Sequence, residues 1–416
     1  MVLFASDMPC DYDRPASRLW WPAALVLFAF GVGSWGGVSA TVERGRDDLR
    51  RAGRSARDLD RLDRGYYTML AEAGSPDGYG WLERSETPPS AVATAPPAVD
   101  PEPFCLRVDD VREYVLKPRI DVVIAGRRWS TNALGMRDRD YALAKPSRTL
   151  RVALLGDSIA NGWGVDDAGR FESRLETAAG MKSRAAGGPR VEILNFAVHG
   201  HGPAARWEHF RRIGAGFDPD VVLFESTTAD IGWDAMRLRV LLTRGVGFDV
   251  DCFRDVLTRG GISSGFDAGT YERLLKPLSG GLLDGVYREV AGRVHARGAV
   301  CILLILPRVG RGGGETARSV LRESALRAGF DEVADVGDAF DDLDPATIAI
   351  CRDDYHPNER GHARLADRIE AYLDHSPVWL GALARVGREP TDGNKDRRGA
   401  RLRTNARADS CAEASR

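Results

Sequence analysis

The sequence has no marked excess of charge of either sign: 58 Lys and Arg residues stand against 60 Asp and Glu residues. A general nucleic-acid binder needs a strongly basic field, so we expect no nucleic-acid partner. Cysteine is also scarce. The six cysteines lie far apart without a CxxC pair, which argues against zinc-ribbon and thioredoxin-type chemistry. At 43% apolar over 416 residues, the chain can still build a sizeable core.

Charged residues are also missing from residues 19–40, LWWPAALVLFAFGVGSWGGVSA, within an N-terminal region 1–40 that predicts a membrane anchor or signal segment. The run is about long enough to cross a bilayer of ~30 Å as a helix. An uncleaved anchor and a cleaved signal both fit. The arginines that follow argue against export, but long C-terminal domains translocate largely regardless of charge. We therefore expect a membrane-anchored or secreted protein with its main domain outside the cytoplasm.

The flanking parts of the chain divide by composition. Residues 41–83 are dense in Arg and Asp with one narrow apolar stripe, which predicts a charged helical stalk, a dimer seam or a helix packed along the main domain. Six prolines in 84–103 predict a semi-rigid linker. Short β-leaning runs in 104–148 predict a small β subdomain. Residues 388–416 are Arg-rich and almost free of large apolar residues, which predicts a disordered tail.

Residues 149–387 alternate apolar runs with amphipathic stretches. The runs are continuously apolar, which is typical of parallel strands covered on both faces. The predicted strands are 150–156, 191–198, 220–226, 300–309 and 331–337. The predicted helices are 169–179, 203–214, 270–297, 314–328 and 357–374. We predict a three-layer α/β/α domain with a five-stranded parallel sheet, whose ligands bind beyond the carboxyl ends of the strands.

Two segments of this domain suggest nucleophilic catalysis. Gly156-Asp157-Ser158 follows the first strand, where a serine at a strand-to-helix turn exposes its hydroxyl at the carboxyl edge. Near the end of the domain, His356 is followed by a proline that we expect to open a helix. Asp353, three residues earlier, can reach the other ring nitrogen and set its tautomer, and Asp354 is a second candidate for that role.

Over residues 148–375 the chain resembles the SGNH/GDSL hydrolase family. TLRVALLGDSIANGWGV is similar to the family's first block, with Ser158 in the nucleophile's place. NFAVHGHG is similar to the second, with Gly200 as its glycine, and RDDYHPNERGH to the fifth, with Asp353 and His356. The resemblance implies a flavodoxin-like sheet, a serine triad, no cofactor, and ester or acyl chemistry on lipids, carbohydrates or small esters.

One block departs from the family's pattern. Where the family has Gly-x-Asn-Asp, this chain has Asp230 in the aspartate's place but Ala229 in the asparagine's. The resemblance leaves the amides of Ser158 and Gly200 as oxyanion donors, and losing one donor of three costs about 3 kcal/mol, or ~100-fold in rate. The side chains that could replace it are Asn161, Thr227 and Thr228. Asn161 could equally bond only backbone.

Clues to a substrate pocket are few. Residues 231–266 form a long insertion after the third strand, which we expect to shape the site. Three tryptophans follow strands, where an aromatic ring could stack on a sugar or simply pack in the core: Trp163, Trp207 and Trp233. The pair His199-x-His201 has no third ligand at a fixed spacing, so we predict no metal site.

The leading hypothesis is a serine esterase that acts through an acyl-enzyme on a small-molecule or glycan ester, with O-acetyl groups of envelope carbohydrate as the candidate substrate. An O-acyltransferase with the same triad is the alternative, since the acceptor decides between them. A catalytically silent binding module is the third reading, and Ala229 is its best support. The sequence does not determine the oligomeric state.

Overall fold

The computed structural model describes residues 104–388 except for four short gaps at 125–126, 248–249, 312–313 and 352–353. The predicted membrane segment, stalk, linker and all but the first residue of the predicted tail lie outside the described residues. No helix within the described part combines the length and apolar character that crossing a bilayer requires.

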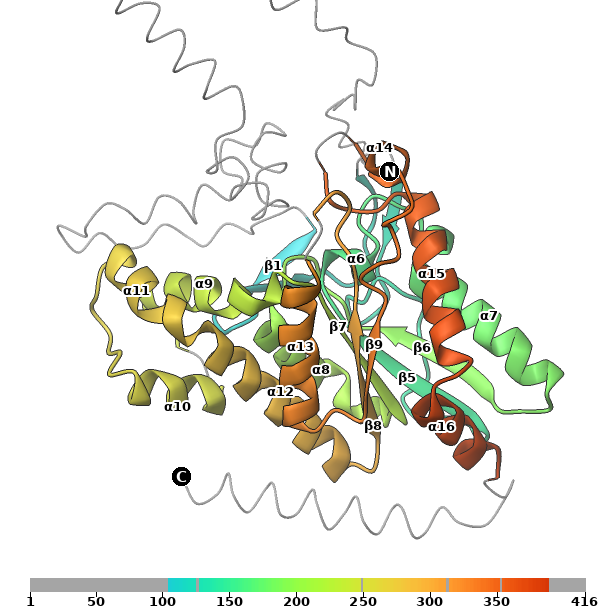
Figure 1. Ribbon diagram of the computed structural model, residues 1–416. Coiled ribbons are helices and arrows are strands. Elements are labelled where there is room, and N and C mark those ends of the chain that lie inside the picture. Colours follow the sequence, from blue (N-terminus) through green and yellow to red (C-terminus); the bar gives the residue numbers. More distant parts are fainter. Residues whose placement is uncertain (1–103, 125–126, 248–249, 312–313, 352–353, 389–416) are drawn as a thin grey trace, which may run out of the picture.

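A five-stranded parallel sheet forms the centre of the domain (Figure 1). Its strands are β5 (Thr149–Leu155), β6 (Arg190–Asn195), β7 (Val221–Ser226), β8 (Val300–Ile305) and β9 (Glu332–Asp335). They lie in the order β6-β5-β7-β8-β9, so the first strand of the sheet is flanked by the second and third. This is the flavodoxin-like order, with its topological switch point beside β5. All five predicted strands are confirmed, each within a few residues of its expected bounds.

Both faces of the sheet are buried, as the continuous apolar runs predicted. Along β5, Ala153 and Leu155 pack into one hydrophobic core, whereas Val152 and Leu154 pack into the other. Successive side chains of a strand point to opposite faces, and β5 is buried at every position, so it is covered on both sides. The two cores are thus separated by the sheet itself.

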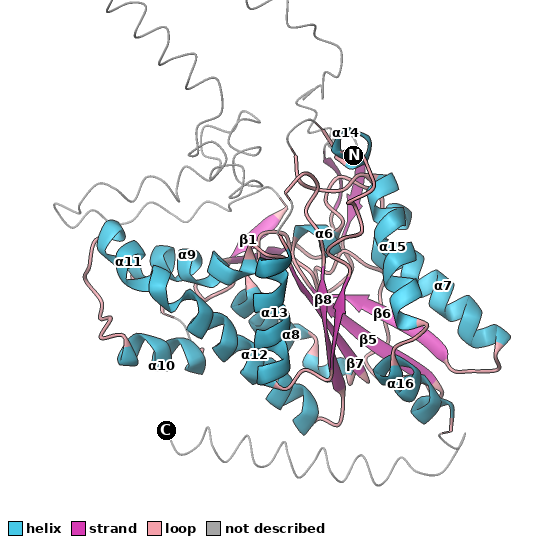
Figure 2. Ribbon diagram, in the orientation of Figure 1, coloured by secondary structure: helices cyan, strands magenta, loops and turns pink. Residues whose placement is uncertain are grey.

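Helices cover the sheet in two layers (Figure 2). One layer, beside β5 and β6, contains α7 (Phe171–Ala185), α15 (Glu359–Leu373) and α16 (Pro377–Gly387). The opposite layer contains α8 (Pro203–Ile213), α12 (Ser279–Ala296) and α13 (Glu315–Ala328), and outside it pack α9 (Asp230–Thr243), α10 (Asp251–Arg259) and α11 (Ala268–Leu275). Short helical turns complete the fold: α6 (Ser158–Asn161), α14 (Pro345–Ile348), η3 (Asp167–Gly169), η4 (Ala215–Phe217) and η5 (Lys276–Leu278).

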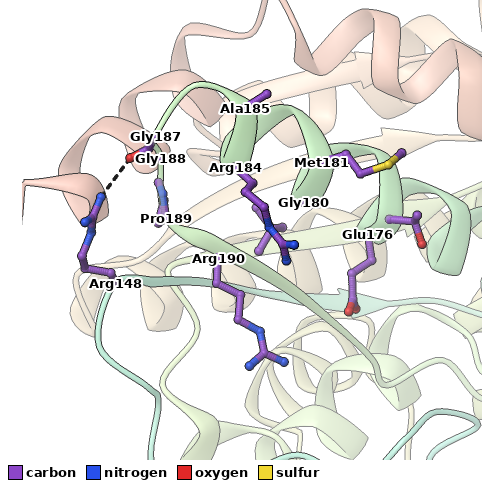
Figure 3. Close-up of a pocket in the computed structure, with 12 residues that line it drawn as sticks. Arg148, Glu176, Gly180, Met181, Arg184, Ala185, Gly187, Gly188, Pro189 and Arg190 are labelled. Carbon is purple, nitrogen blue, oxygen red and sulfur yellow. Dashed lines mark hydrogen bonds between the residues drawn. The ribbon is translucent and has the colours of Figure 1, made fainter.

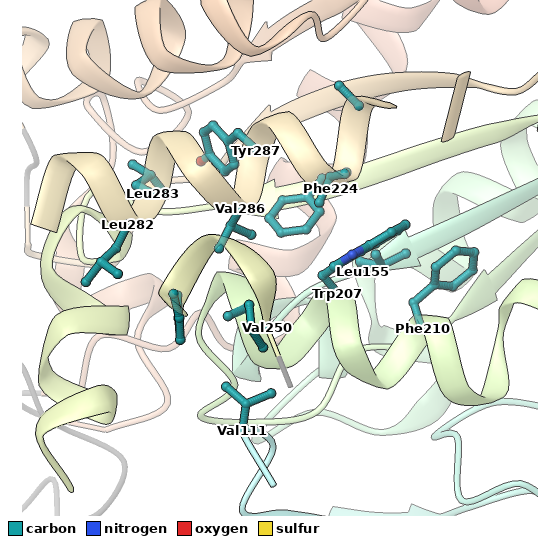
Figure 4. Packing of buried hydrophobic residues seen from close by; sticks show 14 of the residues in the cluster. Val111, Leu155, Trp207, Phe210, Phe224, Val250, Leu282, Leu283, Val286 and Tyr287 are labelled. Carbon is teal, nitrogen blue, oxygen red and sulfur yellow. The ribbon is translucent and has the colours of Figure 1, made fainter. Parts of the chain in front are cut away.

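Aromatic side chains fill the core beneath α8 and α12 (Figure 4). Phe224 of β7 meets Tyr287 of α12 edge to face, with ring centroids 5.8 Å apart. Val286 and Leu283 of α12 belong to the same cluster, together with Trp207 of α8. This packing holds α12 against the sheet and carries the additional helices α9 to α11 on its outer side.

Two predicted elements differ from the structure. The helix expected over 270–297 is divided into α11 and α12 by η5, which contains Pro277. Proline has no amide hydrogen and clashes with the preceding turn, so an α-helix does not run through it unchanged. The insertion at 231–266 is largely helical as well, since α9 and α10 account for most of it. It contributes to the core as much as to the surface.

The segment before the sheet packs on the carboxyl edge. It contains two antiparallel strand pairs, β1 (Cys105–Arg107) with β2 (Tyr114–Leu116) and β3 (Asp121–Ile124) with β4 (Arg127–Ser130). A third hydrophobic cluster joins Tyr114 and Trp129 of this segment to Trp163 and Trp233 of the α/β domain. The Tyr114 hydroxyl also donates a hydrogen bond to the carbonyl of His199 at 2.7 Å. The β-leaning segment thus helps to build the surroundings of the site described next.

One buried histidine makes the fold sensitive to acid. The amide of Phe171 donates to Nδ1 of His362 on α15 at 3.2 Å, which requires a neutral ring. Burial and the charges of Arg137 and Arg170 lower the pKa of His362 to about 3. In the unfolded chain the pKa of histidine is about 6.5, so between these values the unfolded state binds the extra proton. The stabilisation by neutral His362 is complete above pH 6.5 and is lost as the pH falls toward 3.

We therefore expect His362→Gln to be less damaging in acid than at neutral pH. Going from pH 7 to pH 5, the wild type loses about 2 kcal/mol through this ring that the variant does not lose. Urea unfolding of both proteins at the two pH values measures the difference in their free energies of unfolding. That difference should shrink by this amount, and a constant difference would show that the ring accepts a proton in the folded state.

Candidate active site

The turn between β5 and α6 carries Ser158, and its shape requires glycine at position 156. A Cβ on Gly156 would lie only 2.0 Å from Oε2 of Glu225, a residue of β7. The same oxygen accepts a hydrogen bond from the amide of Asp157 at 2.9 Å, and Oδ1 of Asp157 caps α6 by accepting from the amide of Ile159 at 3.1 Å. These contacts fix Ser158 at the start of α6, at the carboxyl edge of the sheet and beside β7.

Ser158 and His356 lie side by side although 198 positions separate them in the chain. Nε2 of His356 is 2.8 Å from Oγ of Ser158, and Nδ1 of His356 is 2.6 Å from Oδ1 of Asp354. The serine and the histidine are each only 1% exposed. A hydrogen-bonded path therefore runs from hydroxyl to imidazole to carboxylate, with distances suited to proton transfer.

The carboxylate in this path belongs to Asp354, so the assignment of the acid to Asp353 is corrected. Asp353 itself lies outside the described residues. Asp354 holds His356 twice, because its Oδ1 also accepts the backbone amide of His356 at 2.8 Å. An aspartate two residues before a histidine can accept hydrogen bonds from both the backbone amide and the ring of that histidine. The position that sequence reasoning kept as the second candidate is the one that contacts the ring.

The ionised form of Asp354 is favoured by its surroundings. Burial alone would raise the pKa of this carboxyl group, but the charge of His356 and the hydrogen bonds from its ring and backbone outweigh burial. The pKa of Asp354 is therefore below its usual value. A carboxylate that stays ionised can accept a hydrogen bond from the Nδ1–H group and leave Nε2 unprotonated to face the serine.

The expected helix start at Pro357 is also wrong. Helix α15 begins at Glu359, because Asn358 caps it by accepting hydrogen bonds from the amides of Arg360 and Gly361. Pro357 instead forms an isolated β-bridge with Ala349. His356 therefore stands in the loop ahead of the helix and is held by the backbone, since its carbonyl accepts from the amide of Ile350 at 3.1 Å.

The groups expected to stabilise the oxyanion, Gly200, Asn161 and Thr228, lie in different surroundings. Gly200 lies in the loop after β6 with a φ of 70°, a conformation suited to glycine, and its carbonyl accepts from Nε1 of Trp233 at 3.3 Å. The side chain of Asn161 is buried and donates from Nδ2 to the carbonyl of Ala197 at 2.9 Å, so it ties α6 to the loop after β6. Thr228 is half-buried at the end of β7, next to Ala229.

Asp230 is part of a buried ion pair that the sequence did not reveal. Its carboxylate accepts from the Arg206 guanidinium at 2.6 Å and from the Ser226 hydroxyl at 2.7 Å. Arg206 also lies 3.3 Å from Oδ2 of Asp157. The pair therefore joins α8, α9 and the turn that carries Ser158. The sequence signal for this ion pair was Arg206 on the buried face of the predicted helix 203–214. The spacing of residues did not identify Asp230 as its partner.

The family model for the GDSL-like Lipase/Acylhydrolase family matches residues 154–364. This range contains the whole hydrogen-bonded path from Ser158 to Asp354. The chain belongs to this family. It is a serine hydrolase that acts on ester bonds.

Solved structures similar to this family member are matched at low identity. An α/β hydrolase from the metagenome of Lake Arreo, Spain, is 17% identical, with 57% of this chain and 99% of that chain covered and a TM-score of 0.36. An acetyl xylan esterase is 16% identical, with 53% and 98% covered and a TM-score of 0.32. A psychrotrophic esterase from a Pseudoalteromonas species is 15% identical, with 56% and 99% covered and a TM-score of 0.34. No curated protein matches the chain.

The three tryptophans of this GDSL-like chain have different places. Trp163 is buried, with its ring centroid 6.5 Å from that of His356 and 6.0 Å from that of Trp129, so it packs beside the candidate catalytic histidine. Trp233 lines a cavity at the carboxyl edge. Trp207 lies in the core under α8 and donates from Nε1 to Glu289 at 3.2 Å, away from the site.

The two histidines of the second block belong to the packing around the site. Nε2 of His201 lies 2.9 Å from the carbonyl of Tyr114, and Nε2 of His199 lies 3.6 Å from Sγ of Cys105. Burial lowers the pKa of His199 to about 3, with smaller contributions from His356 and Arg137, and this keeps the ring neutral. Each ring thus contacts a different protein group in the segment that covers the carboxyl edge.

One group of potential metal ligands lies among the described residues, at the opposite edge of the sheet: His295, Cys301 and Asp331, with ligand atoms within 4.8 Å of one another. Nε2 of His295 already lies 2.8 Å from Oδ2 of Asp331. Burial and the nearby Asp331 raise the pKa of the Cys301 thiol to about 12, and metals bind the thiolate. These contacts account for the group as a histidine–aspartate pair beside a buried thiol.

Two cavities differ in their relation to the candidate site. One, of about 710 Å³, lies between the end of α7 and the start of β6 (Figure 3). It includes Arg148, whose guanidinium donates to the carbonyl of Gly187 at 2.9 Å, and lies at the amino edge of the sheet, away from Ser158. The other, of about 410 Å³, is lined by Thr228 and Ala229 at the carboxyl end of β7. Only the smaller cavity adjoins the candidate chemistry.

Proposed function

We propose that Ser158, His356 and Asp354 are the catalytic triad of an esterase that removes small acyl groups, such as acetyl, from carbohydrate. The observation that carries this proposal is the continuous hydrogen-bonded path, 2.8 Å from Ser158 to His356 and 2.6 Å from His356 to Asp354. The Ser158 hydroxyl faces an imidazole whose far nitrogen is held by a carboxylate, the arrangement that activates a serine nucleophile.

In the first half of the reaction, Oγ of Ser158 attacks the carbonyl carbon of the ester while Nε2 of His356 takes the hydroxyl proton. Asp354 stabilises the imidazolium that forms and keeps its ring in place. The carbonyl oxygen becomes an oxyanion in the tetrahedral intermediate. When the intermediate collapses, the bond to the alcohol breaks and His356 gives its proton to the departing alcohol oxygen, which leaves the acyl group on Ser158.

Backbone amides hold the oxyanion. The amide of Ser158 stands at the first position of α6, where helix geometry provides no intrahelical acceptor. The amide of Gly200 is the second donor. Ala229 cannot supply a side-chain donor, so stabilisation of the oxyanion rests on the two amides and on any hydroxyl that reaches it from Thr228. In the second half of the reaction, water attacks the acyl-enzyme and the same groups act in reverse order.

Burial supports a small acyl group. Ser158 is 1% exposed, so little space is open around its hydroxyl. A long acyl chain needs a continuous apolar channel to the nucleophile, whereas an acetyl group needs little room. Trp233 in the adjoining cavity supports a carbohydrate as the alcohol part, because the apolar faces of sugar rings pack on aromatic side chains.

The purified protein tests the proposal with 4-nitrophenyl acetate as acyl donor, in the presence and absence of an oligosaccharide acceptor. The expected result is release of acetate at the same rate with and without the acceptor. Acetylated oligosaccharide as the main product would instead establish the O-acyltransferase reaction with the same triad. Folded protein that releases no 4-nitrophenol would support a binding module that has lost its catalysis.

We also propose that the catalytic domain lies outside the cytoplasm, where envelope carbohydrate is found. The uncharged run at 19–40 supports this location. Protease should then digest the domain in cells whose outer layers have been made permeable while the inner membrane is still intact. Protection of the domain until the inner membrane is broken would contradict the proposed location.

A further inference from the structure

The cavity of about 410 Å³ beside the candidate triad is the starting point, and we call it the Trp233 cleft. Its wall is made by side chains from the end of β7, from α9, from the α11–η5 turn and from the loop after β8. The ones that matter for charge and stacking are Thr228, Trp233, Arg239, Glu272, Lys276 and Arg308. A cleft of this volume has room for about one sugar ring and its substituents.

Two contacts connect the cleft to the catalytic groups. On one side, Nε1 of Trp233 donates to the carbonyl of Gly200, the residue whose amide we place in the oxyanion hole. On the other side, the Arg308 guanidinium lies 5.5 Å from the ring centroid of Tyr355, whose ring is 4.1 Å from that of His356. The cleft is therefore connected to the candidate catalytic groups through Gly200 on one side and Tyr355 on the other.

The charge of the cleft is positive although the whole chain carries a net charge of −2. The cationic lining side chains Arg239 and Lys276 outnumber the anionic Glu272. Glu272 reaches Arg239 only at 4.0 Å and is 66% exposed, so it neutralises little of this charge. Cations grouped in a concave wall attract an anionic ligand more strongly than the same charges spread over a surface.

We propose that the Trp233 cleft binds a carboxylate of the substrate, so that the enzyme prefers esters that carry an acidic group about one sugar ring from the scissile bond. This inference rests on the proposed function and adds to it the substrate class. The carboxylate belongs to the alcohol part, as in an acetylated uronic acid, because the buried Ser158 favours a small acyl group.

One pair of substrates tests this preference, the methyl glycoside of O-acetyl galacturonic acid against that of O-acetyl galactose. The expected result is a kcat/KM at least five-fold higher for the acidic member, which approaches equality at 1 M salt. Equal values for the two esters at low salt would overturn the proposal.

Substitutions in the cleft give the second test. Arg239→Met and Lys276→Met should each lower the acidic preference, the ratio of kcat/KM for the acidic ester to that for the neutral ester, about five-fold. Glu272→Gln should raise the preference. Arg293→Met, on an exposed part of α12 outside the cleft, is the matched control and should change nothing. Equal losses on acidic and neutral esters in the two cleft variants would show a structural role only.

Binding without turnover distinguishes failure of this inference from failure of the proposed function. Calorimetric titration of the Ser158→Ala protein with oligogalacturonate should show binding that a neutral galacto-oligosaccharide lacks and that Arg239→Met weakens. If 4-nitrophenyl acetate is hydrolysed but neither acidic preference nor acidic binding is found, the cleft proposal alone is wrong. If no ester is hydrolysed but acidic binding is found, the cleft proposal stands and the proposed function is wrong.

Discussion

Ser158→Ala is expected to lower kcat for 4-nitrophenyl acetate by about 10⁴- to 10⁶-fold, because the remaining groups can still bind the ester but have no oxygen to acylate. The serine is fixed between Asp157 and the first turn of α6, and the substitution removes one oxygen without changing the backbone. Circular dichroism and the thermal midpoint should therefore remain close to those of the wild type. Steady-state rates of the two proteins measure the effect.

Ser173→Ala provides the control for this experiment. Ser173 lies on α7, where its hydroxyl is 3.3 Å from Oε2 of Glu172 and distant in the fold from the candidate site. Its replacement should leave kcat within two-fold of the wild type. A folded Ser158→Ala protein that keeps more than a tenth of the wild-type kcat would show that another group carries the acyl transfer.

Asp354→Asn is the second substitution with a large expected effect, about 10⁴-fold in kcat. An amide in this position can donate to Nδ1 of His356, which places the ring proton on Nε2 and removes the base that Ser158 needs. The amide keeps the size and shape of the carboxylate, so the loop is expected to fold normally. Rates of 4-nitrophenyl acetate hydrolysis measure the loss.

Asp353→Asn is the matched comparison because it makes the same change one position earlier. It should lower kcat no more than a few-fold, since Asp354 supplies the carboxylate to the ring. A large loss in Asp353→Asn together with a small one in Asp354→Asn would reverse the assignment of the acid and restore the one expected from the sequence.

The sheet was predictable because its strands have one simple property. The run Leu150–Leu155 is apolar at every position except Arg151, and a nearly continuous apolar run is typical of a strand covered on both faces. Ser158 and His356 were predictable for a different reason, since short motifs place them at the carboxyl edge and after the last strand. Both kinds of signal are local in the sequence.

The parts that sequence reasoning missed depend on competition between neighbouring groups. Asp353 and Asp354 are both within reach of the His356 ring by spacing, and the hydrogen bond from the backbone amide of His356 accompanies Asp354. Pro357 and Asn358 are both good residues for a helix start, and Asn358 caps α15 with its side chain. Such choices are decided by three-dimensional contacts that a motif does not contain.

Long-range pairs were missed for a related reason. Arg206 and Asp230 lie on different helices, and nothing in either segment indicates that the two charges neutralise each other below the turn of Ser158. The Trp233 cleft likewise requires α9, the α11–η5 turn and the loop after β8 to meet. The sequence showed Trp233 as one aromatic candidate among three, and in the fold it lines this cleft.

Phosphonylation of the wild-type protein tests the central claim most directly. A fluorophosphonate reacts with a serine whose hydroxyl is activated by a histidine, and peptide mass spectrometry locates the adduct. If His356 activates Ser158, we expect a single adduct on Ser158. This adduct should be absent from Ser158→Ala and form at least 100-fold more slowly in His356→Ala. A folded wild-type protein that remains unlabelled, or that carries the adduct on another residue, would contradict it.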